Sequence, residues 1–195
     1  MDVREFDFDL PPELIAQEPR AAREAARLLC VWRREGEPEH RSVADLPGLF
    51  RSGDVLVINN TRVFPARLLG RRVPSGGAVE CLLIRRIDSD DARPDEEWWE
   101  ALMHPGQRLG PGAEVVFEGS RTIHGEVRER RFHGRRVIRL RTDDLSALAD
   151  AVDAIGHVPL PPYIHRGDRP EDRERYQTVF ARHRGSVAAP RPACI

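Results

Sequence analysis

The sequence contains no lysine, so each of its 31 cationic side chains is an arginine. A genome rich in G and C explains this usage, because arginine then serves as the default surface cation. Recognition of phosphate by planar guanidinium groups also explains it, and the two explanations are compatible. The acidic side chains bring the net charge to −1, so the overall charge predicts no class of partner.

Cysteine is scarce, and the common metal-binding patterns are absent. Cys30, Cys81 and Cys194 lie far apart without a C-x-x-C pair, which argues against a disulfide framework or a zinc knuckle and fits a reducing compartment. His157 and His165 have no third ligand at metal spacing, so we expect no metal site. The sequence also lacks a P-loop, a G-x-G-x-x-G motif and a nucleophile elbow.

Long apolar runs are absent as well. The N-terminal residues MDVREFDFDL are acidic, which does not fit a signal peptide. No apolar run approaches the ~20 residues that are needed to span a bilayer. We therefore expect a cytoplasmic protein without a membrane partner.

Residues 63–142 contain six short strand-like stretches that are separated by turns rich in glycine and proline. This spacing predicts a small antiparallel β-barrel or sandwich. The stretches are VFPARLLGRRV, AVECLLIRRI, EWWEALM, AEVVFEG, RTIHGEVRER and RRVIRLR.

The segments on either side carry different signals. The run VLVIN at 55–59 is the clearest buried strand in the chain. Apolar residues at helical spacing predict a helix over Leu145–Ile155, ended by Gly156 in a left-handed conformation. Asp168 and Glu171 form the D-x-x-E pattern of a capping box and predict a second helix, with Tyr176, Val179 and Phe180 on its apolar face.

Neither flank has enough apolar residues to fold alone, so we expect the two flanks to meet. The fold class is therefore α/β, with a main domain into which the β-barrel is inserted. Residues 1–62 form the first part of the main domain, residues 63–142 the barrel, and residues 143–190 the return to the main domain.

Polar residues with several possible roles follow the predicted strand and the Pro-rich turn. Asn59–Arg62 lies at a strand end, where ligands gather in open α/β sheets, although an Asx turn explains the same residues. His157 and Tyr163 suit acid–base chemistry or stacking, and a purely structural loop histidine is an equal alternative.

Arginine is concentrated in residues 121–141, which hold eight Arg and two Glu. A paired ribbon would gather these side chains on one face, and Phe132 and His133 at its tip would be able to stack on a base. A solvated strand pair is the alternative. The candidate RNA-binding residues are Arg128, Arg130, Arg131, Arg135 and Arg136.

Several blocks of sequence resemble the S-adenosylmethionine:tRNA ribosyltransferase-isomerase family of queuosine biosynthesis, in order and in spacing. The blocks are FDFDLPPELIAQEP at 6–19, GDVLVINNTRVFPARLLGR at 53–71, GHVPLPPYIHR at 156–166, DRERYQTVFAR at 172–182 and GSVAAP at 185–190. The resemblance covers residues 1–190. It implies a larger, barrel-like α/β domain that is partial here, with a small inserted β-barrel.

The resemblance also implies a reaction. The family moves the ribosyl part of S-adenosylmethionine onto 7-aminomethyl-7-deazaguanine at the tRNA wobble position and isomerises it, which gives epoxyqueuosine and releases adenine and methionine. S-adenosylmethionine is then a co-substrate, no cofactor is bound permanently, and we expect a monomer. The matching blocks nominate His157 and Tyr163 for acid–base catalysis. They nominate six residues for substrate binding: Asn59, Thr61, Arg62, Arg67, Tyr176 and Gln177.

The sequence departs from the family after Pro190. The family continues with Thr-Ala-Gly-Leu-His-Phe and a long C-terminal half, whereas residues 191–195 are an unrelated tail. We expect a frameshift, a missing C-terminal half and impaired activity. A non-catalytic RNA-binding fragment built on the Arg-rich barrel is the alternative, and an interaction protein that has lost catalysis is a third possibility.

Overall fold

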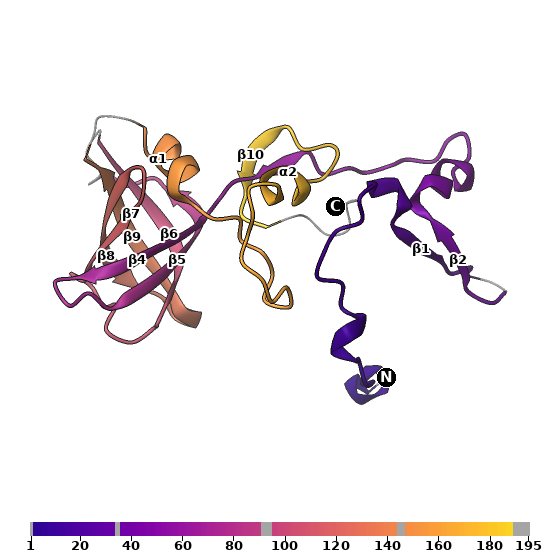
Figure 1. Ribbon diagram of the computed structural model, residues 1–195, viewed down its shortest axis with the longest axis horizontal. Coiled ribbons are helices and arrows are strands. Elements are labelled where there is room, and N and C mark those ends of the chain that lie inside the picture. Colours follow the sequence, from indigo (N-terminus) through magenta and orange to yellow (C-terminus); the bar gives the residue numbers. More distant parts are fainter. Residues whose placement is uncertain (1, 34–35, 91–94, 144–146, 189–195) are drawn as a thin grey trace.

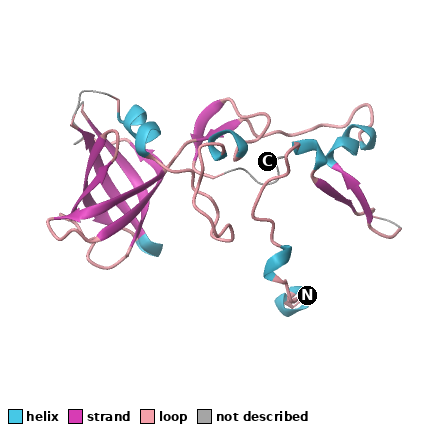
Figure 2. Ribbon diagram, in the orientation of Figure 1, coloured by secondary structure: helices cyan, strands magenta, loops and turns pink. Residues whose placement is uncertain are grey.

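The computed structural model of the chain describes residues 2–33, 36–90, 95–143 and 147–188, so the tail 191–195 lies outside the described residues. Strands predominate and the helices are short (Figure 2). The strands are β1 (Arg27–Cys30), β2 (Glu39–Ser42), β3 (Thr61–Val63), β4 (Arg67–Val73), β5 (Ala78–Ile87), β6 (Glu96–His104), β7 (Glu114–Glu118), β8 (Thr122–Arg130), β9 (Arg135–Thr142) and β10 (His183–Ser186). The α-helices are α1 (Leu148–Ile155) and α2 (Asp172–Arg175), and the 3₁₀ helices are η1 (Val3–Phe6), η2 (Pro12–Leu14), η3 (Arg23–Ala25), η4 (Val43–Leu49) and η5 (Phe132–Gly134).

Strands β4 to β9 close into an antiparallel barrel in the order β4-β5-β6-β9-β8-β7. The barrel forms one end of an elongated molecule, and the β1–β2 hairpin lies at the other (Figure 1). The period of two that marks a strand is visible in β8, where Ile123 and Val127 are buried and His124 and Glu126 are partly exposed. The six-stranded antiparallel barrel predicted from the sequence is therefore confirmed.

The main hydrophobic core fills the barrel. Leu68, Leu83, Phe117 and Leu140 are fully buried there, and α1 packs Leu148, Ala151 and Val152 against the same cluster. Cys81 belongs to this core, and its burial raises the pKa of the thiol to about 12. The thiol is therefore neutral at physiological pH and chemically inert.

Arg136 occupies the barrel wall with only 1 % of its surface exposed. Its guanidinium donates hydrogen bonds of 2.9 Å to the carbonyls of Gly106, Leu109 and Arg135. Burial lowers the pKa of this arginine, and the backbone carbonyls take the place of water around its charge. The prediction that Arg136 contacts RNA is therefore wrong, because its side chain is inside the protein.

The chain enters and leaves the barrel at one crossing point. The backbone groups of Arg67 and His157 exchange two hydrogen bonds, of 3.2 and 2.8 Å. Gly156 lies so close to this crossing that a Cβ atom there would be 2.0 Å from the carbonyl oxygen of Pro65. Its φ of −76° is not left-handed, so the predicted left-handed helix end is wrong; close approach explains the glycine instead.

The segments that precede and follow the barrel in the sequence also pair with each other beyond this crossing. β3 and β10 form a two-stranded parallel sheet, in which Thr61 lies opposite His183 and Arg62 opposite Arg184. The carbonyl of Asn60 extends this contact by accepting hydrogen bonds from two backbone amides, those of Arg182 and His183. β9 ends at Thr142, and residues 144–146, where the helix predicted over Leu145–Ile155 would begin, lie outside the described residues.

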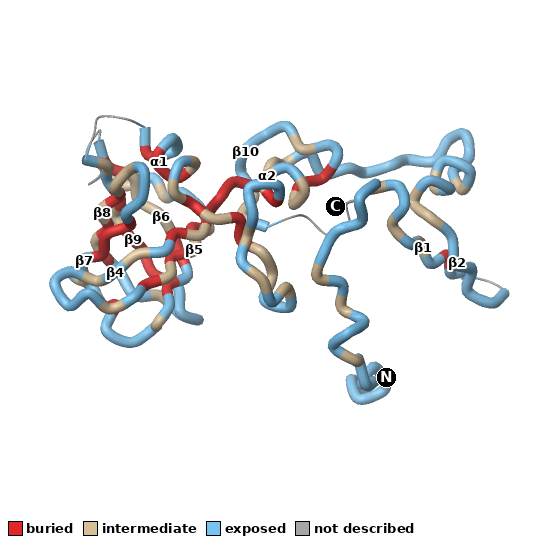
Figure 3. Tube along the Cα trace, viewed as in Figure 1, coloured by how far each residue is buried: buried red, intermediate tan, exposed pale blue. Residues whose placement is uncertain are grey.

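The run VLVIN does not form the expected buried strand. Val55 and Val57 are 86 % and 89 % exposed, and no described strand pairs with this run. A strand needs a neighbour for its backbone groups, whereas residues 54–60 are exposed and irregular and connect the β1–β2 end of the molecule to β3 (Figure 3). Within β1, Arg27 and Leu29 are exposed, Leu28 is half-buried and Cys30 is buried. The described residues thus form a mostly β structure with a closed barrel and few helices.

The second predicted helix is much shorter than expected. α2 spans only Asp172–Arg175, and Val179 and Phe180 are exposed beyond its end. Asp168 does not cap it, because its carboxylate binds the amide of Val158 and the side chain of His157. The tertiary contact of Asp168 replaces the predicted local cap.

Replacement of Arg136 by alanine should destabilise the chain strongly. It removes the donor for three carbonyls and leaves a cavity, so we expect a loss of about 3 kcal/mol in the free energy of unfolding. Urea unfolding followed by the fluorescence of Trp98 and Trp99 measures the loss. Arg86→Ala, which removes a mostly exposed side chain from β5, is the control and should cost less than about 1 kcal/mol. Equal losses in both variants would contradict the structural role of Arg136.

Candidate functional site

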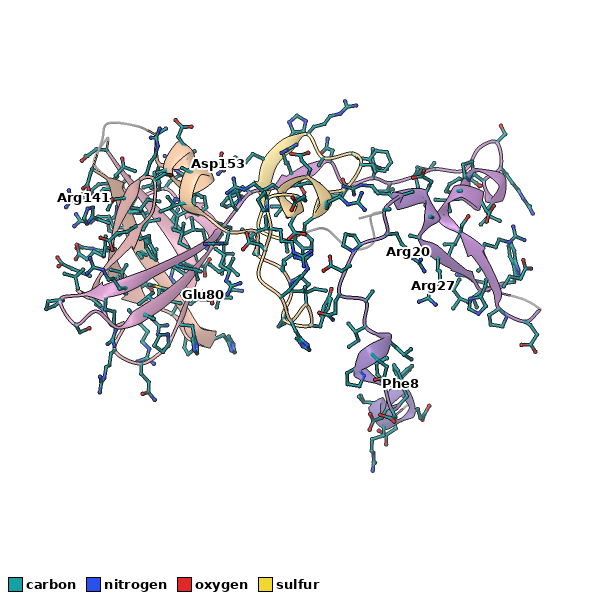
Figure 4. The ribbon with its side chains drawn as sticks, in the orientation of Figure 1. Phe8, Arg20, Arg27, Glu80, Arg141 and Asp153 are labelled. Carbon is teal, nitrogen blue, oxygen red and sulfur yellow. The ribbon has the colours of Figure 1, made fainter. Side chains whose placement is uncertain are left out.

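A groove of about 740 Å³ lies between the barrel and the Pro-rich segment 159–167. Arg67 and Glu80 line its barrel side, and Tyr163 and Tyr176 line it from the Pro-rich segment and the end of α2. Glu80 lies on the side of the barrel that faces the central segment (Figure 4). The volume is within the ~300–1,000 Å³ that is typical of small-molecule sites.

A smaller hollow of about 250 Å³ adjoins the groove and shares part of its wall. Tyr163, Arg166 and Tyr176 line both, and residues 16–19 of the N-terminal segment line the smaller one. The side chain of Gln17 donates to the carbonyl of Tyr163 at 2.9 Å and accepts from a backbone amide, that of His165, at 2.8 Å. One side chain from the N-terminal segment therefore holds the loop that carries Tyr163.

Ion pairs fix the charged residues of the groove. The guanidinium of Arg67 contacts the carboxylate of Glu80 at 2.9 to 3.0 Å. Arg166 forms a two-pronged pair with Asp172, with distances of 2.7 and 2.9 Å. The hydrogen bond from Arg166 lowers the pKa of the Asp172 carboxyl, so this carboxylate is ionised over the whole physiological range.

His157 is paired with an acidic side chain. Its Nδ1 lies 2.8 Å from the Oδ1 of Asp168, and the imidazole is 40 % exposed. A carboxylate that accepts a hydrogen bond from Nδ1–H leaves the lone pair of Nε2 available, which is the usual arrangement of a histidine general base. His157 is not among the residues that line the groove, and its backbone is joined to Arg67, which does line it.

Three of the sequence candidates that follow the VLVI run interact mainly with the protein itself. The Oδ1 of Asn59 accepts from the amide and the hydroxyl of Thr61, at 2.8 and 2.6 Å, which is an Asx turn. Arg62 pairs with Glu174 on α2. Arg62 and Gln177 line a separate hollow of about 340 Å³.

Gln177 is buried and uses its amide as a backbone clamp. Its Oε1 accepts from the amide of Val63 at 2.8 Å, and its Nε2 donates to the carbonyls of Val63 and Arg173 at 2.9 and 3.0 Å. The side chain thus pairs with β3 as a neighbouring strand would. The structure consequently brings Arg67, Tyr163 and Tyr176 together in one groove. Gln177 does not line this groove and instead holds the backbone of Val63.

Most arginines of the predicted RNA-binding ribbon are paired with acidic residues. Arg128 contacts Glu126 at 2.6 Å and lies over the ring of Trp98, 5.5 Å from its centroid. Arg131 and Arg135 are also paired, the first with Glu129 at 3.0 Å and the second with Glu100 at 3.2 Å. Glu126 and Glu129 on β8 itself and Glu100 on β6 therefore neutralise much of the charge that the sequence concentrates in 121–141.

Comparison with known proteins places these features in a family. A family model described as a queuosine biosynthesis protein matches residues 3–194. The chain belongs to this family. One relative is the S-adenosylmethionine:tRNA ribosyltransferase-isomerase of Solibacter usitatus, which is 48 % identical over 97 % of this chain and 56 % of the relative. Another is the enzyme of the same name from Symbiobacterium thermophilum, which is 47 % identical over 97 % of this chain and 52 % of the relative. The chain thus spans about half the length of these curated relatives.

A solved structure is also similar in sequence. The crystal structure of an S-adenosylmethionine tRNA ribosyltransferase from Thermotoga maritima is 33 % identical, with 82 % of this chain and 52 % of that chain covered and a TM-score of 0.34. In the described part of this family member, no helix is long and apolar enough to cross a membrane. The same residues contain no group of three or more His, Cys, Asp or Glu side chains placed to hold a metal.

Two acidic residues of the site were missed by the sequence analysis. Glu80 was read only as part of a barrel strand, because no local motif links it to Arg67, thirteen positions earlier in the chain. Asp168 was assigned to a capping box, although its position eleven residues after His157 in a Gly- and Pro-rich turn is compatible with a contact between the two. Only the path of the turn decides between these roles.

Replacement of Gln177 by alanine should loosen the contact between α2 and β3. The change leaves the amide and carbonyl of Val63 without partners inside the protein, so we expect a loss of about 2–3 kcal/mol. Hydrogen exchange at the Val63 amide should accelerate, and NMR or mass spectrometry measures it. Thr61→Ala, which removes a half-exposed side chain from the same strand, should change the exchange rate of that amide much less.

The pair of Arg166 and Asp172 should make stability depend on pH in acid. The pKa of Asp172 is lower in the folded chain than its unfolded value of ~3.9, so its contribution is complete above that value and is lost as the pH falls through the folded pKa. Asp172→Asn should therefore lower the free energy of unfolding at pH 7. The difference from the wild type should shrink below about pH 4.

Glu171→Gln is the matched control for this pH dependence, because Glu171 precedes α2 and is exposed. Urea unfolding at a series of pH values gives both differences. A difference for Asp172→Asn that stays constant from pH 7 to pH 3 would show that the charge of Asp172 does not stabilise the fold.

Proposed function

We propose that the chain carries part of an S-adenosylmethionine:tRNA ribosyltransferase-isomerase and that its groove binds S-adenosylmethionine. The observation that carries the proposal is the meeting of Arg67, Tyr163 and Tyr176 in one groove of suitable volume in a member of this family. A sulfonium is attracted to aromatic faces, and a guanidinium suits the methionine carboxylate. These groups match two charged groups of that co-substrate, the sulfonium and the carboxylate.

The proposed reaction has three chemical requirements. A base removes a proton next to the sulfonium, an acid or hydrogen-bond donor assists the departure of adenine, and the neutral amine of 7-aminomethyl-7-deazaguanine on the tRNA attacks the sugar carbon. In the proposal His157 is the base, held by Asp168, and Tyr163 is the acid. The ribosyl group is then isomerised on the tRNA to give epoxyqueuosine, and methionine leaves as its carbon–sulfur bond to the ribosyl group breaks.

The remaining candidates have supporting positions in this proposal. Asn59, Thr61, Arg62 and Gln177 shape the strand that leads into the barrel, and Tyr176 presents its ring to the groove. The proposed organisation is a main domain formed by residues 1–62 and 143–190 around a barrel inserted at 63–142. Cytoplasmic location and a monomeric state remain predictions.

The proposal includes reduced activity for this chain on its own. Val55, Leu56, Val57 and Ile58 expose apolar surface directly before the Asn59 turn. Exposed apolar runs of this kind favour aggregation. We therefore place the complete reaction in full-length relatives and co-substrate binding in the groove of this chain.

A calorimetric titration of the chain with S-adenosylmethionine tests the groove. Arg67→Gln should weaken binding about tenfold or more, because a charge-assisted contact to the carboxylate is lost. Arg71→Gln is the matched control, since Arg71 lies on the same strand and pairs with Glu118 away from the groove. S-adenosylhomocysteine, which lacks the positive sulfonium, should bind more weakly than S-adenosylmethionine.

Several results would contradict this proposal. They are no heat of binding for the wild type, equal affinities for the two ligands, or the same loss in Arg67→Gln and Arg71→Gln. In a full-length relative, the variants that correspond to His157→Gln and Tyr163→Phe should slow the release of adenine from S-adenosylmethionine in the presence of substrate tRNA.

A non-catalytic RNA-binding role is the second candidate function. The exposed tip of the β8–β9 hairpin favours it, and the paired state of Arg128, Arg131 and Arg135 weakens it. RNA binding that falls steeply with salt, without release of adenine in a full-length relative, would favour this role over the enzymatic one.

A further inference from the structure

The tip of the β8–β9 hairpin projects from the barrel at the end opposite α1 (Figure 2). The amide of Arg131 donates to the carbonyl of Arg135 at 2.9 Å and closes the hairpin. Between them, His133 and Gly134 have φ values of 55° and 78°. A positive φ is uncommon for a residue other than glycine, and both residues adopt it directly after Phe132, at the tip of the hairpin.

Phe132 presents its ring to solvent, with 89 % of its surface exposed. Single exposed apolar residues are ordinary on protein surfaces and indicate nothing by themselves. Here the ring borders a hollow of about 320 Å³ that is also lined by Glu129, Arg130 and Arg131. An aromatic face, a hollow and cationic side chains therefore occur together at the tip of one hairpin.

The arginines at the tip differ in their pairing. Arg131 contacts Glu129 at 3.0 Å, and Arg135 contacts Glu100 at 3.2 Å. Arg130 is exposed, and within the described residues no acidic side chain forms an ion pair with it. The guanidinium of Arg130 is thus the group at the tip that is available to an anion from outside.

We propose that the hairpin tip is a binding subsite for one unpaired nucleotide of an RNA, with the base stacked on Phe132 and its phosphate on Arg130. An aromatic face and a guanidinium beside it are the pair of groups that single-stranded RNA uses, and stacking does not require a particular base. A membrane surface would require several apolar anchors, and the tip has one. That the RNA is the tRNA substrate rests on the proposed function.

Binding of the chain to two synthetic RNAs tests this subsite by fluorescence anisotropy, without S-adenosylmethionine. One RNA is a hairpin with a single-stranded loop, and the other is a fully paired duplex of the same stem sequence. Phe132→Ala should weaken binding of the looped hairpin about five- to a hundredfold, and Phe132→Trp should restore it. Binding of the duplex should not change in either variant.

Arg130 is tested through the salt dependence of the same binding. Arg130→Ala should reduce the slope of log K against log salt by about one, because one phosphate contact is lost. Arg51→Ala removes one exposed positive charge elsewhere and should leave the slope unchanged. Phe8→Ala removes an exposed aromatic ring far from the barrel and should leave the affinity unchanged (Figure 4).

The outcomes separate the subsite from the proposed function. Absence of hairpin binding by the wild type, or equal affinity of Phe132→Ala and the wild type, overturns the subsite even if S-adenosylmethionine binds in the groove. A loss in Phe132→Ala that Phe132→Trp does not restore also overturns it. If Phe132→Trp restores RNA binding but the chain does not bind S-adenosylmethionine, the result supports the subsite and contradicts the proposal that the groove binds S-adenosylmethionine. Thermal unfolding of each variant confirms that the exposed tip has been changed without loss of the fold.

Discussion

The arrangement of the groove depends on the crossing at which the chain enters and leaves the barrel. Arg67 starts β4 and His157 follows α1, and their backbones exchange two hydrogen bonds. Gly156 allows the two segments to approach so closely that a side chain would collide with the carbonyl of Pro65. Because the Pro-rich segment begins immediately after this crossing, its position relative to the barrel is set there. The groove is the space that this constraint leaves between them.

Besides forming ion pairs, arginine side chains in this chain donate hydrogen bonds to backbone carbonyls. Arg23 donates to the carbonyls of Glu174 and Gln177 at 2.7 and 2.5 Å, and Arg173 donates to those of Asp153 and Gly156 at 2.7 and 2.9 Å. The planar guanidinium has five donors in fixed directions, so one side chain can bridge two segments. Irregular segments with few strand partners gain their hydrogen bonds in this way. Several of the 31 arginines therefore serve the fold, besides any that contact phosphate.

The exposed VLVI run and the paired arginines of residues 121–141 show that a local sequence pattern does not by itself predict burial or net charge. An apolar run indicates that a segment is suited to burial, and a neighbour is still required to bury it; Val55 and Val57 have none among the described residues. A cluster of arginines likewise indicates positive charge only until neighbouring strands contribute their acidic residues. Glu100 on β6 lies beside Arg85 and Arg135 from two other strands, so it compensates charge that appears unbalanced along the sequence.

Closure of the six strands into a barrel was decided by the tertiary structure, through the β6–β9 and β4–β7 pairings. The sequence alone determined the strands themselves, because strand period, turn residues and short spacing are local signals. It also determined the family, since the matching blocks extend along nearly the whole chain. The groove was only partly predictable: Arg67, Tyr163 and Tyr176 were identified, while their meeting and the partners Glu80 and Asp168 were not. Burial of Arg136 and the backbone role of Gln177 were decided by tertiary structure alone. These depend on contacts between residues far apart in the chain, and such contacts leave no periodic signal in the sequence.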